Sequence, residues 1–386
     1  MKSSDDRNNR IRARIISFGF AGLLVLLLLL SAALPDRTFS ENENRSLTAR
    51  PAPTMETVAS GKFMRQFESW ASDQIVCRDG WVAAKTRTDM AALRKDNGRV
   101  YFGREGYLFQ IETLDEQQLD KNIGYVEAFF RQAKEKRPQM RTSMIAAPTS
   151  AEVVPSLLPR YAPVPDERAA AERIGRRLGA DFCDVLPALL ENSQSYLYYR
   201  TDHHWTTLGA YFAYAAWSAA PPPAAAYKVT TVADDFYGTA FSKAGVKGPA
   251  DRIDRFDLAA AGSVSWTMQV WEGKEATVFR DLYDEAYLTG KDKYGYFLGG
   301  NHPLTVIERQ TQEPPRTILV LKDSYANCFI PFLTAEYDRI VAVDLRYYKQ
   351  SPLELAEEYN ADELLVLYNI IGFSNDRNLI YLKGDA

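Results

Sequence analysis

The stretch Thr317-Ile318-Leu319-Val320-Leu321-Lys322-Asp323-Ser324 decides the fold of this chain. Its apolar run is short and bounded by polar residues, which predicts a buried strand. A serine directly after such a strand, ahead of a helix-like segment, lies at the carboxyl end of the sheet. Ligand sites of open α/β sheets lie at this edge, and free N–H groups there can stabilise an oxyanion. We therefore expect Ser324 at a functional site.

The alternation of strand and helix continues on both sides of this stretch. Towards the carboxyl terminus, residues 339–343 and 363–367 predict strands and residues 353–359 predict a helix. Upstream, the sequence predicts strands at residues 141–147 and 180–185 and helices at residues 58–94, 116–137, 169–178 and 207–219. This pattern is typical of an α/β fold, a parallel sheet flanked by helices.

Two further segments have a β character. Residues 100–109 predict two short strands around a turn that contains Gly103 and Gly106. Residues 227–316 are mixed, with short β-like pieces at residues 277–280 and 286–290 and many turns.

The amino-terminal region predicts a membrane anchor. Residues 15–34 carry no charge, and a helix of this length, at ~1.5 Å per residue, matches a hydrocarbon core of roughly 30 Å. Basic residues at positions 2, 7, 10, 12 and 14 hold the preceding end in the cytoplasm. A cleaved signal peptide ending near Ser31-Ala32-Ala33 is the alternative, but the apolar cores of signal peptides usually span only ~7–15 residues.

The expected organisation therefore has four parts. Residues 1–14 form a cytoplasmic tail, residues 15–34 the anchor, residues 35–95 a juxtamembrane and helical segment, and residues 96–386 the main domain. The protein is expected in the cell membrane as a single-pass chain, with the main domain extracytoplasmic, either periplasmic or extracellular.

Composition excludes several classes of protein. A formal net charge of -4 argues against nucleic-acid binding, which requires a basic surface. The cysteines Cys77, Cys183 and Cys328 form no CxxC pair, so neither a zinc knuckle nor a disulfide scaffold is indicated. The sequence leaves open whether two of these three cysteines form a disulfide.

The candidate chemistry centres on residues 201–205 and on Ser324. The chain has three histidines, and two of them, His203 and His204, follow Asp202. In an extended segment Asp202 and His204 would share a face while His203 points elsewhere. A serine nucleophile needs a base and a carboxylate that orients the base, so we assign Ser324, His204 and Asp202 to these roles.

Other interpretations of these residues are structural or metal-based. A serine after a strand can simply cap a helix. The histidine pair lacks an HExxH-type spacing, and we expect no metal and no cofactor. His302 is expected in a turn at residues 299–303, where Gly300 and Asn301 permit close approach to a ligand.

The chain resembles the DHHW family of SGNH-hydrolase-like proteins, which is related to the O-acetylation proteins of alginate and other exopolysaccharides. The resemblance rests on separated motifs in the same order, at residues 40–45, 101–103, 106–108, 199–206, 296–303 and 322–325. In the related proteins an Asp-x-His pair precedes the serine, a permuted order that matches Asp202, His204 and Ser324. His203 fills the x position and receives no catalytic role.

The resemblance implies an O-acetyltransferase that acts on a cell-surface or secreted polysaccharide through an acetyl-serine intermediate. A multipass membrane-bound O-acyltransferase is the expected partner. Weaker candidates for oxyanion or substrate contacts are Arg346, Asn369, Gly300, Asn301 and Trp205. A carbohydrate acetyl esterase and a non-catalytic glycan-binding scaffold of an acetylation or export complex remain alternatives.

Overall fold

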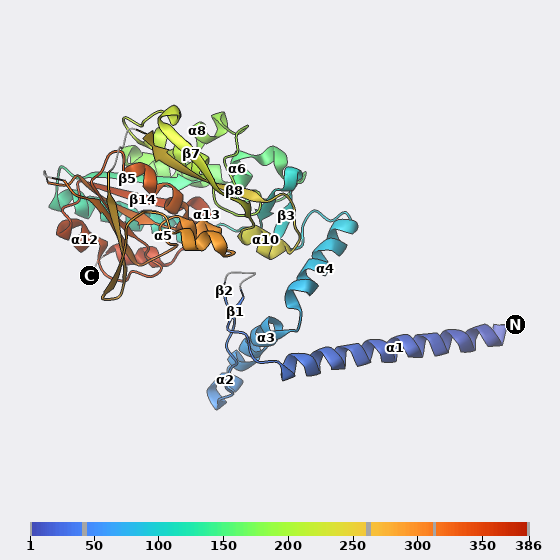
Figure 1. The fold of residues 1–386 in the computed structure, drawn as a ribbon. Helices are drawn as coiled ribbons and strands as arrows, with labels where there is room; N and C mark the ends of the chain where they lie inside the picture. Colours follow the sequence, from blue (N-terminus) through green and yellow to red (C-terminus); the bar gives the residue numbers. More distant parts are fainter. Residues whose placement is uncertain (1, 41–44, 260–263, 312–313, 384–386) are drawn as a thin grey trace. The chain divides into compact units, whose positions relative to one another are not determined.

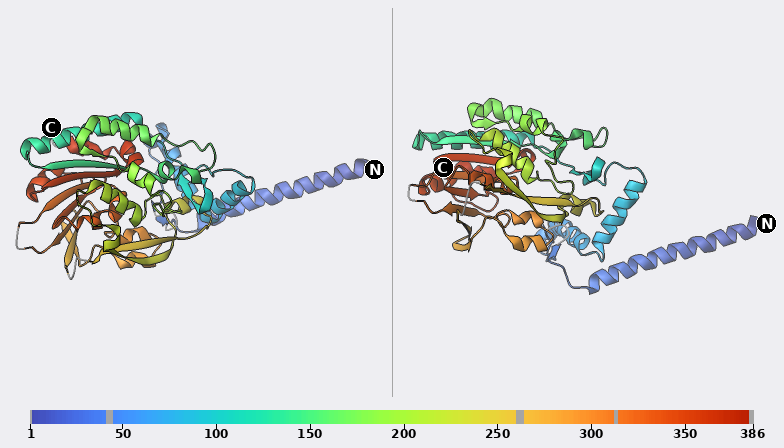
Figure 2. Two further views of the ribbon diagram at one scale, coloured as in Figure 1. Left: turned by 90° about the horizontal axis from the view of Figure 1, so that it is seen from above. Right: turned by 45° about the horizontal axis from the view of Figure 1, so that its top comes forward.

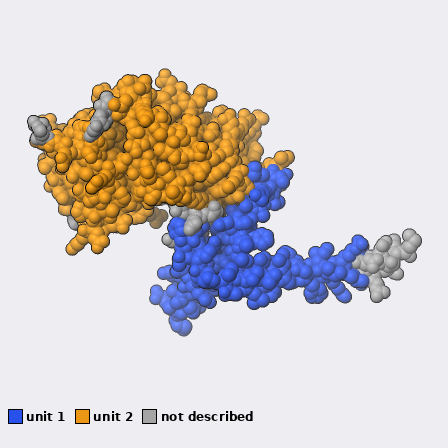
Figure 3. Space-filling model, viewed as in Figure 1, with its two compact units in different colours: residues 1–91 blue, residues 92–386 orange. Residues whose placement is uncertain are grey.

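The computed structural model describes residues 2–40, 45–259, 264–311 and 314–383 (Figure 1). The chain forms two compact units, residues 1–91 and residues 92–386, which Figure 3 distinguishes by colour. Residues 41–44, which belong to the motif expected at residues 40–45, lie outside the described residues.

The first unit is mainly helical. Residues 9–33 are long and apolar enough to cross a membrane, with a mean hydropathy of 2.6, although a signal sequence has the same properties. The helix expected over residues 58–94 is divided, because Gly61 and Cys77 adopt positive φ angles of 67° and 56°. The elements are α1 (Lys2–Ala33), β1 (Phe39–Ser40), β2 (Arg45–Ser46), α2 (Met55–Ala59), α3 (Lys62–Gln74) and α4 (Arg78–Ala91).

The second unit contains an eight-stranded sheet flanked by helices, which confirms the expected α/β class. The strand order is β10-β9-β11-β13-β12-β14-β5-β6. The strands of this sheet are β5 (Arg141–Ala147), β6 (Phe182–Cys183), β9 (Trp266–Glu272), β10 (Glu275–Phe279), β11 (Leu304–Arg309), β12 (Thr317–Lys322), β13 (Arg339–Val343) and β14 (Glu363–Asn369).

The sheet is mixed, so the expectation of a parallel sheet holds for only part of it. Strands β13, β12, β14, β5 and β6 run parallel to one another. Strand β11 pairs antiparallel with β13, and β9 and β10 extend the same edge as antiparallel strands. Short connections suffice between antiparallel strands, so this part of the chain shows no strand–helix alternation in its sequence.

Helices cover both faces of the sheet (Figure 2). Alternate residues of β12 point to opposite sides, so that Ile318 and Val320 pack with α9 while Leu319 and Leu321 pack with α5 and α7. The helices of this unit are α5 (Glu116–Lys136), α6 (Ser150–Val153), α7 (Glu167–Leu178), α8 (Leu186–Glu191), α9 (Thr207–Trp217), α10 (Thr239–Ala244), α11 (Ile330–Leu333), α12 (Pro352–Glu358) and α13 (Ile370–Asn375).

In the described part of the second unit, two hairpins lie outside the large sheet. The strands β3 (Val100–Phe102) and β4 (Leu108–Gln110) form the hairpin expected over residues 100–109. The strands β7 (Tyr227–Phe236) and β8 (Asp251–Leu258) form a longer hairpin within the segment that the sequence left mixed. The β-like piece expected at residues 286–290 is instead a 3₁₀ helix, η6 (Glu285–Thr289), because the Asp284 carboxylate caps it by accepting from the Ala286 N–H.

Candidate active site

The loop that carries the histidines is held by a buried carboxylate on β8. Asp251, which has no solvent exposure, accepts hydrogen bonds from the backbone N–H groups of Arg200 at 2.8 Å and Thr201 at 2.7 Å. Its carboxylate also accepts from the hydroxyls of Thr201 and Tyr196. Asp251 therefore fixes the backbone immediately before Asp202, and no motif in the sequence indicated this residue.

Asp202, His204 and Ser324 form one continuous chain of hydrogen bonds. The Nδ1 atom of His204 lies 2.5 Å from Oδ1 of Asp202, and its Nε2 atom lies 2.7 Å from Oγ of Ser324. Because a carboxylate only accepts, Nδ1 carries the proton, which leaves Nε2 free to accept the hydroxyl proton of Ser324. This is the arrangement that a serine nucleophile and its base require.

Asp202 is kept ionised by its surroundings. Burial raises the pKa of its carboxyl, but the electrostatic interaction with the neighbouring imidazoles of His203 and His204 and the hydrogen bonds that it accepts lower the pKa well below its usual value. Its Oδ2 atom accepts from the backbone N–H of Thr239 at 2.7 Å and from the Thr239 hydroxyl at 3.0 Å. A Cβ atom at Gly238 would lie 2.2 Å from this oxygen, so the carboxylate needs the absence of a side chain there.

Ser324 begins the 3₁₀ helix η8 (Ser324–Cys328), which follows β12. The carboxylate of Asp323 caps this helix by accepting from the Tyr325 N–H at 2.9 Å, and it also accepts from the Asn369 N–H at 2.7 Å. Ser324 therefore lies at the carboxyl end of β12, as expected from the sequence. The helix-cap role that the sequence left open belongs to Asp323.

Aromatic side chains connect the turn that begins at Ser324 to the loop at residues 200–205, which we call the histidine loop. The ring of Tyr294 stacks on His204 with centroids 3.9 Å apart, and its hydroxyl donates to the Ser324 carbonyl at 2.9 Å. The indole N–H of Trp205 donates to the Tyr325 carbonyl at 2.9 Å, and the Tyr325 hydroxyl donates to the His203 carbonyl. These contacts hold the base and the serine in one rigid cluster.

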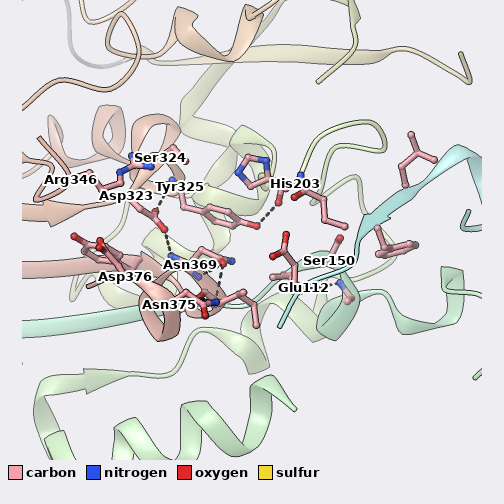
Figure 4. A pocket seen from close by; sticks show the side chains of 18 of the residues that line it. Glu112, Ser150, His203, Asp323, Ser324, Tyr325, Arg346, Asn369, Asn375 and Asp376 are labelled. Carbon is pink, nitrogen blue, oxygen red and sulfur yellow. Dashed lines mark hydrogen bonds between the residues drawn. The ribbon is translucent and has the colours of Figure 1, made fainter. Parts of the chain in front are cut away.

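Ser324 opens onto a cavity of about 420 Å³ (Figure 4). Hairpin β3–β4, the turn after β5 and the carboxyl ends of β12 and β14 supply its walls. The residues that line the cavity are Leu108, Phe109, Gln110, Glu112, Thr149, Ser150, Ala151, His203, Asp323, Ser324, Tyr325, Arg346, Tyr368, Asn369, Ile371, Gly372, Asn375, Asp376 and Asn378.

The weaker candidates fall into two groups. Arg346 and Asn369 line the cavity, whereas Trp205, Gly300 and Asn301 do not. Trp205 is fully buried in the core, and Asn301 interacts with buried polar side chains through its Oδ1 atom, which lies 3.3 Å from Nζ of Lys322. Trp205, Gly300 and Asn301 therefore lie outside the cavity lining, and their expected substrate contacts stay a prediction.

The prediction that His203 points away from the site is wrong, because its side chain lines the cavity. Its Nδ1 atom lies 2.8 Å from Oγ1 of Thr239. The Thr239 hydroxyl donates its one proton to Asp202, so Nδ1 of His203 carries a proton and Nε2 is an acceptor. Burial lowers the pKa of His203 to about 3, and the imidazole is neutral at physiological pH.

Asp202, His203 and His204 also offer metal-ligand atoms that lie within 4.8 Å of one another. The Nδ1 atoms of both histidines and the Asp202 carboxylate already take part in the hydrogen bonds described above, so a metal ion bound through these atoms would displace the proton network. His302 lies outside the cavity lining, and its Nε2 atom is 2.9 Å from the Gly299 carbonyl.

Comparisons with known proteins confirm the resemblance inferred from the motifs. Residues 172–343 match the sequence family of DHHW proteins, and residues 100–242 match the family described as the SGNH hydrolase-like domain of the acetyltransferase AlgX. No curated protein matches the chain.

The fold is similar to that of solved structures at low sequence identity. A DHHW family protein from Eubacterium siraeum is 20% identical, with a TM-score of 0.58 and coverage of 75% of this chain and 95% of that chain. Bacillus cereus PatB1 with a sulfonyl adduct is 20% identical, with a TM-score of 0.61 and coverage of 76% of this chain and 100% of that chain. These similarities show a common fold, and its SGNH hydrolase-like description comes from the family match at residues 100–242.

Proposed function

We propose that this chain is an extracytoplasmic O-acetyltransferase that acts on a cell-surface or secreted polysaccharide. Its DHHW and SGNH-hydrolase-like sequence features support this proposal. The observation that carries this proposal is the hydrogen-bonded chain from Asp202 through His204 to Ser324, which ends at a cavity. The family description that names an acetyltransferase supports acetyl as the transferred group.

The reaction proceeds in two steps at Ser324. In the first, His204 takes the hydroxyl proton while Oγ attacks the acetyl carbonyl of the donor, and the donor's leaving group departs with that proton. In the second, a sugar hydroxyl gives its proton to His204 and attacks the acetyl-serine. The sugar ester forms, and Ser324 regains its proton from His204.

The negative oxygen of each tetrahedral intermediate needs hydrogen-bond donors. Among the described residues, nothing accepts a hydrogen bond from the backbone N–H of Ser324, which makes this group one such donor. The Arg346 guanidinium, which lies on the same side of the cavity as Ser324 in Figure 4, supplies a second. The Asn369 side chain is a weaker candidate, because its Nδ2 atom already donates to the Ala147 carbonyl at 3.3 Å.

We propose that the reaction takes place at the membrane, with the apolar part of α1 as the anchor. As a single-pass anchor it would keep residues 96–386 next to a multipass membrane-bound O-acyltransferase, which supplies acetyl groups from the cytoplasm. Fractionation of cells that produce a carboxyl-terminally tagged chain tests this placement. A full-length chain in the membrane fraction supports the anchor, and a shortened soluble chain indicates a cleaved signal peptide.

A chromogenic acetyl ester tests the chemistry on the detergent-solubilised full-length chain. We expect turnover by the wild type and by a His302→Ala control, and loss of turnover in Ser324→Ala and His204→Ala. The absence of wild-type turnover, with glycan binding retained, would favour the scaffold alternative.

An added oligosaccharide acceptor then separates the two enzymatic alternatives, since both proceed through the same acetyl-serine. Mass spectrometry of the acceptor detects transferred acetyl groups. An acetylated oligosaccharide supports the transferase, whereas release of acetate alone supports the esterase.

A further inference from the structure

The charges that line the cavity bear on which polysaccharide can enter it. The lining contains the acidic residues Glu112, Asp323 and Asp376 and the basic residue Arg346. Arg346 is already paired with a carboxylate, because its Nη2 atom lies 2.5 Å from Oδ2 of Asp344. The cavity therefore offers little positive charge to an anionic ligand.

Glu112 is the carboxylate in this lining that has no hydrogen-bond donor within the described part of the chain. Burial raises the pKa of its carboxyl, and the charge of Lys243 only partly offsets this effect. The Lys243 ammonium donates to Gln110. The Glu112 carboxylate is half-buried and still reached by water, so sugar hydroxyl groups that displace this water can donate hydrogen bonds to it.

His203 provides a second acceptor in the same lining. Its Nδ1 proton is directed to Thr239, and its neutral Nε2 atom has no donor among the described residues. Figure 4 shows Glu112, Ser150 and His203 towards one end of the cavity and Arg346 and Asp376 towards the other. An acceptor sugar whose reacting hydroxyl is at Ser324 could therefore extend another hydroxyl to Glu112 or His203.

We infer that Glu112 and His203 select an uncharged, hydroxyl-rich glycan as the acetyl acceptor and disfavour a polymer of uronic acids. This inference rests on the proposed function. A uronate carboxylate in the cavity would face Glu112 and Asp323 across a space that is partly shielded from water, where charges of like sign repel strongly. A neutral sugar would instead donate hydrogen bonds to the same groups.

Competing acceptors test the selectivity on the full-length chain. With a chromogenic acetyl ester as donor, we expect kcat/KM for a neutral hexose oligosaccharide to exceed that for a hexuronic acid oligosaccharide of equal length by about tenfold or more, the size of one charge-assisted hydrogen bond. The Glu112→Gln variant should reduce this ratio, because the amide repels uronate less. Glu116→Gln, a change of the same type outside the cavity lining, should leave the ratio unchanged.

Binding measurements separate this inference from the proposed function. Isothermal titration of Ser324→Ala with each oligosaccharide requires no turnover, and we expect tighter binding of the neutral one. Equal or tighter binding of the uronate, or an unchanged ratio in Glu112→Gln, would overturn the inference even if acetyl transfer is observed. A chain that binds the neutral glycan more tightly without acetyl-ester turnover would overturn the proposed function, and only the binding preference of the cavity would stand.

Discussion

Replacement of Asp251 by alanine is the most informative test of how the histidine loop is built. The change removes the acceptor for two backbone N–H groups and two hydroxyls in a site without solvent exposure. A buried donor left without a partner costs about 1–3 kcal/mol. The N–H groups of Arg200 and Thr201 cannot rotate towards water, whereas the two hydroxyls can reorient.

The expected loss of unfolding free energy for Asp251→Ala is about 2–6 kcal/mol, because two buried N–H groups lose their acceptor at about 1–3 kcal/mol each. Part of the gross loss is offset, because burial raises the pKa of the Asp251 carboxyl and its removal relieves that desolvation. Asp251→Asn keeps one acceptor and removes the buried charge, so it should cost less than the alanine. Both changes should lower kcat/KM, roughly 100-fold for the alanine, since Asp202 directly follows the released backbone.

Urea denaturation followed by circular dichroism, together with the acetyl-ester assay, measures both effects. Asp257→Asn is the matched control on the same strand, because its side chain is 41% exposed and its carboxylate pairs with Arg255. It should change stability by less than about 0.5 kcal/mol. An Asp251→Ala chain as stable and active as this control would refute the reasoning.

Three further changes probe the site. Gly238→Ala should lower acetyl-ester kcat/KM at least about tenfold, because the new Cβ would displace the Asp202 carboxylate; wild-type kinetics would contradict this. Tyr294→Leu should lower kcat by about 5- to 30-fold through loss of the ring stacked on His204, whereas Tyr294→Phe should lose less; equal losses would exclude the stacking role. Burial raises the pKa of Glu167 from 4.5 to about 7. The folded chain therefore binds this proton more tightly than the unfolded chain, and stability should fall by up to about 3 kcal/mol as pH rises from 4.5 to 7. In Glu167→Gln, the urea midpoint should not show this fall between pH 5 and pH 8. A fall equal to that of the wild type would contradict the prediction.

Local sequence patterns were sufficient to predict the strands where the chain alternates between strand and helix. The apolar run before Ser324 indicated β12, and the runs at residues 339–343 and 363–367 indicated β13 and β14. Between residues 227 and 316 these patterns were insufficient. The pairing of β9, β10 and β11 depends on partners elsewhere in the sheet, and a short segment carries little of that information.

The sequence by itself determined the candidate trio, because Asp202, His204 and Ser324 carry the chemistry in their residue types and in the order of their motifs. Their catalytic roles remain a prediction. Only the tertiary structure decided which groups surround them: Asp251 and Thr239 behind the histidine loop, and Glu112 across the cavity. The physical reason is that such contacts join residues far apart in the chain, as with the 120 positions between His204 and Ser324. Spacing along the chain does not specify them, whereas the order of strands in the sheet does.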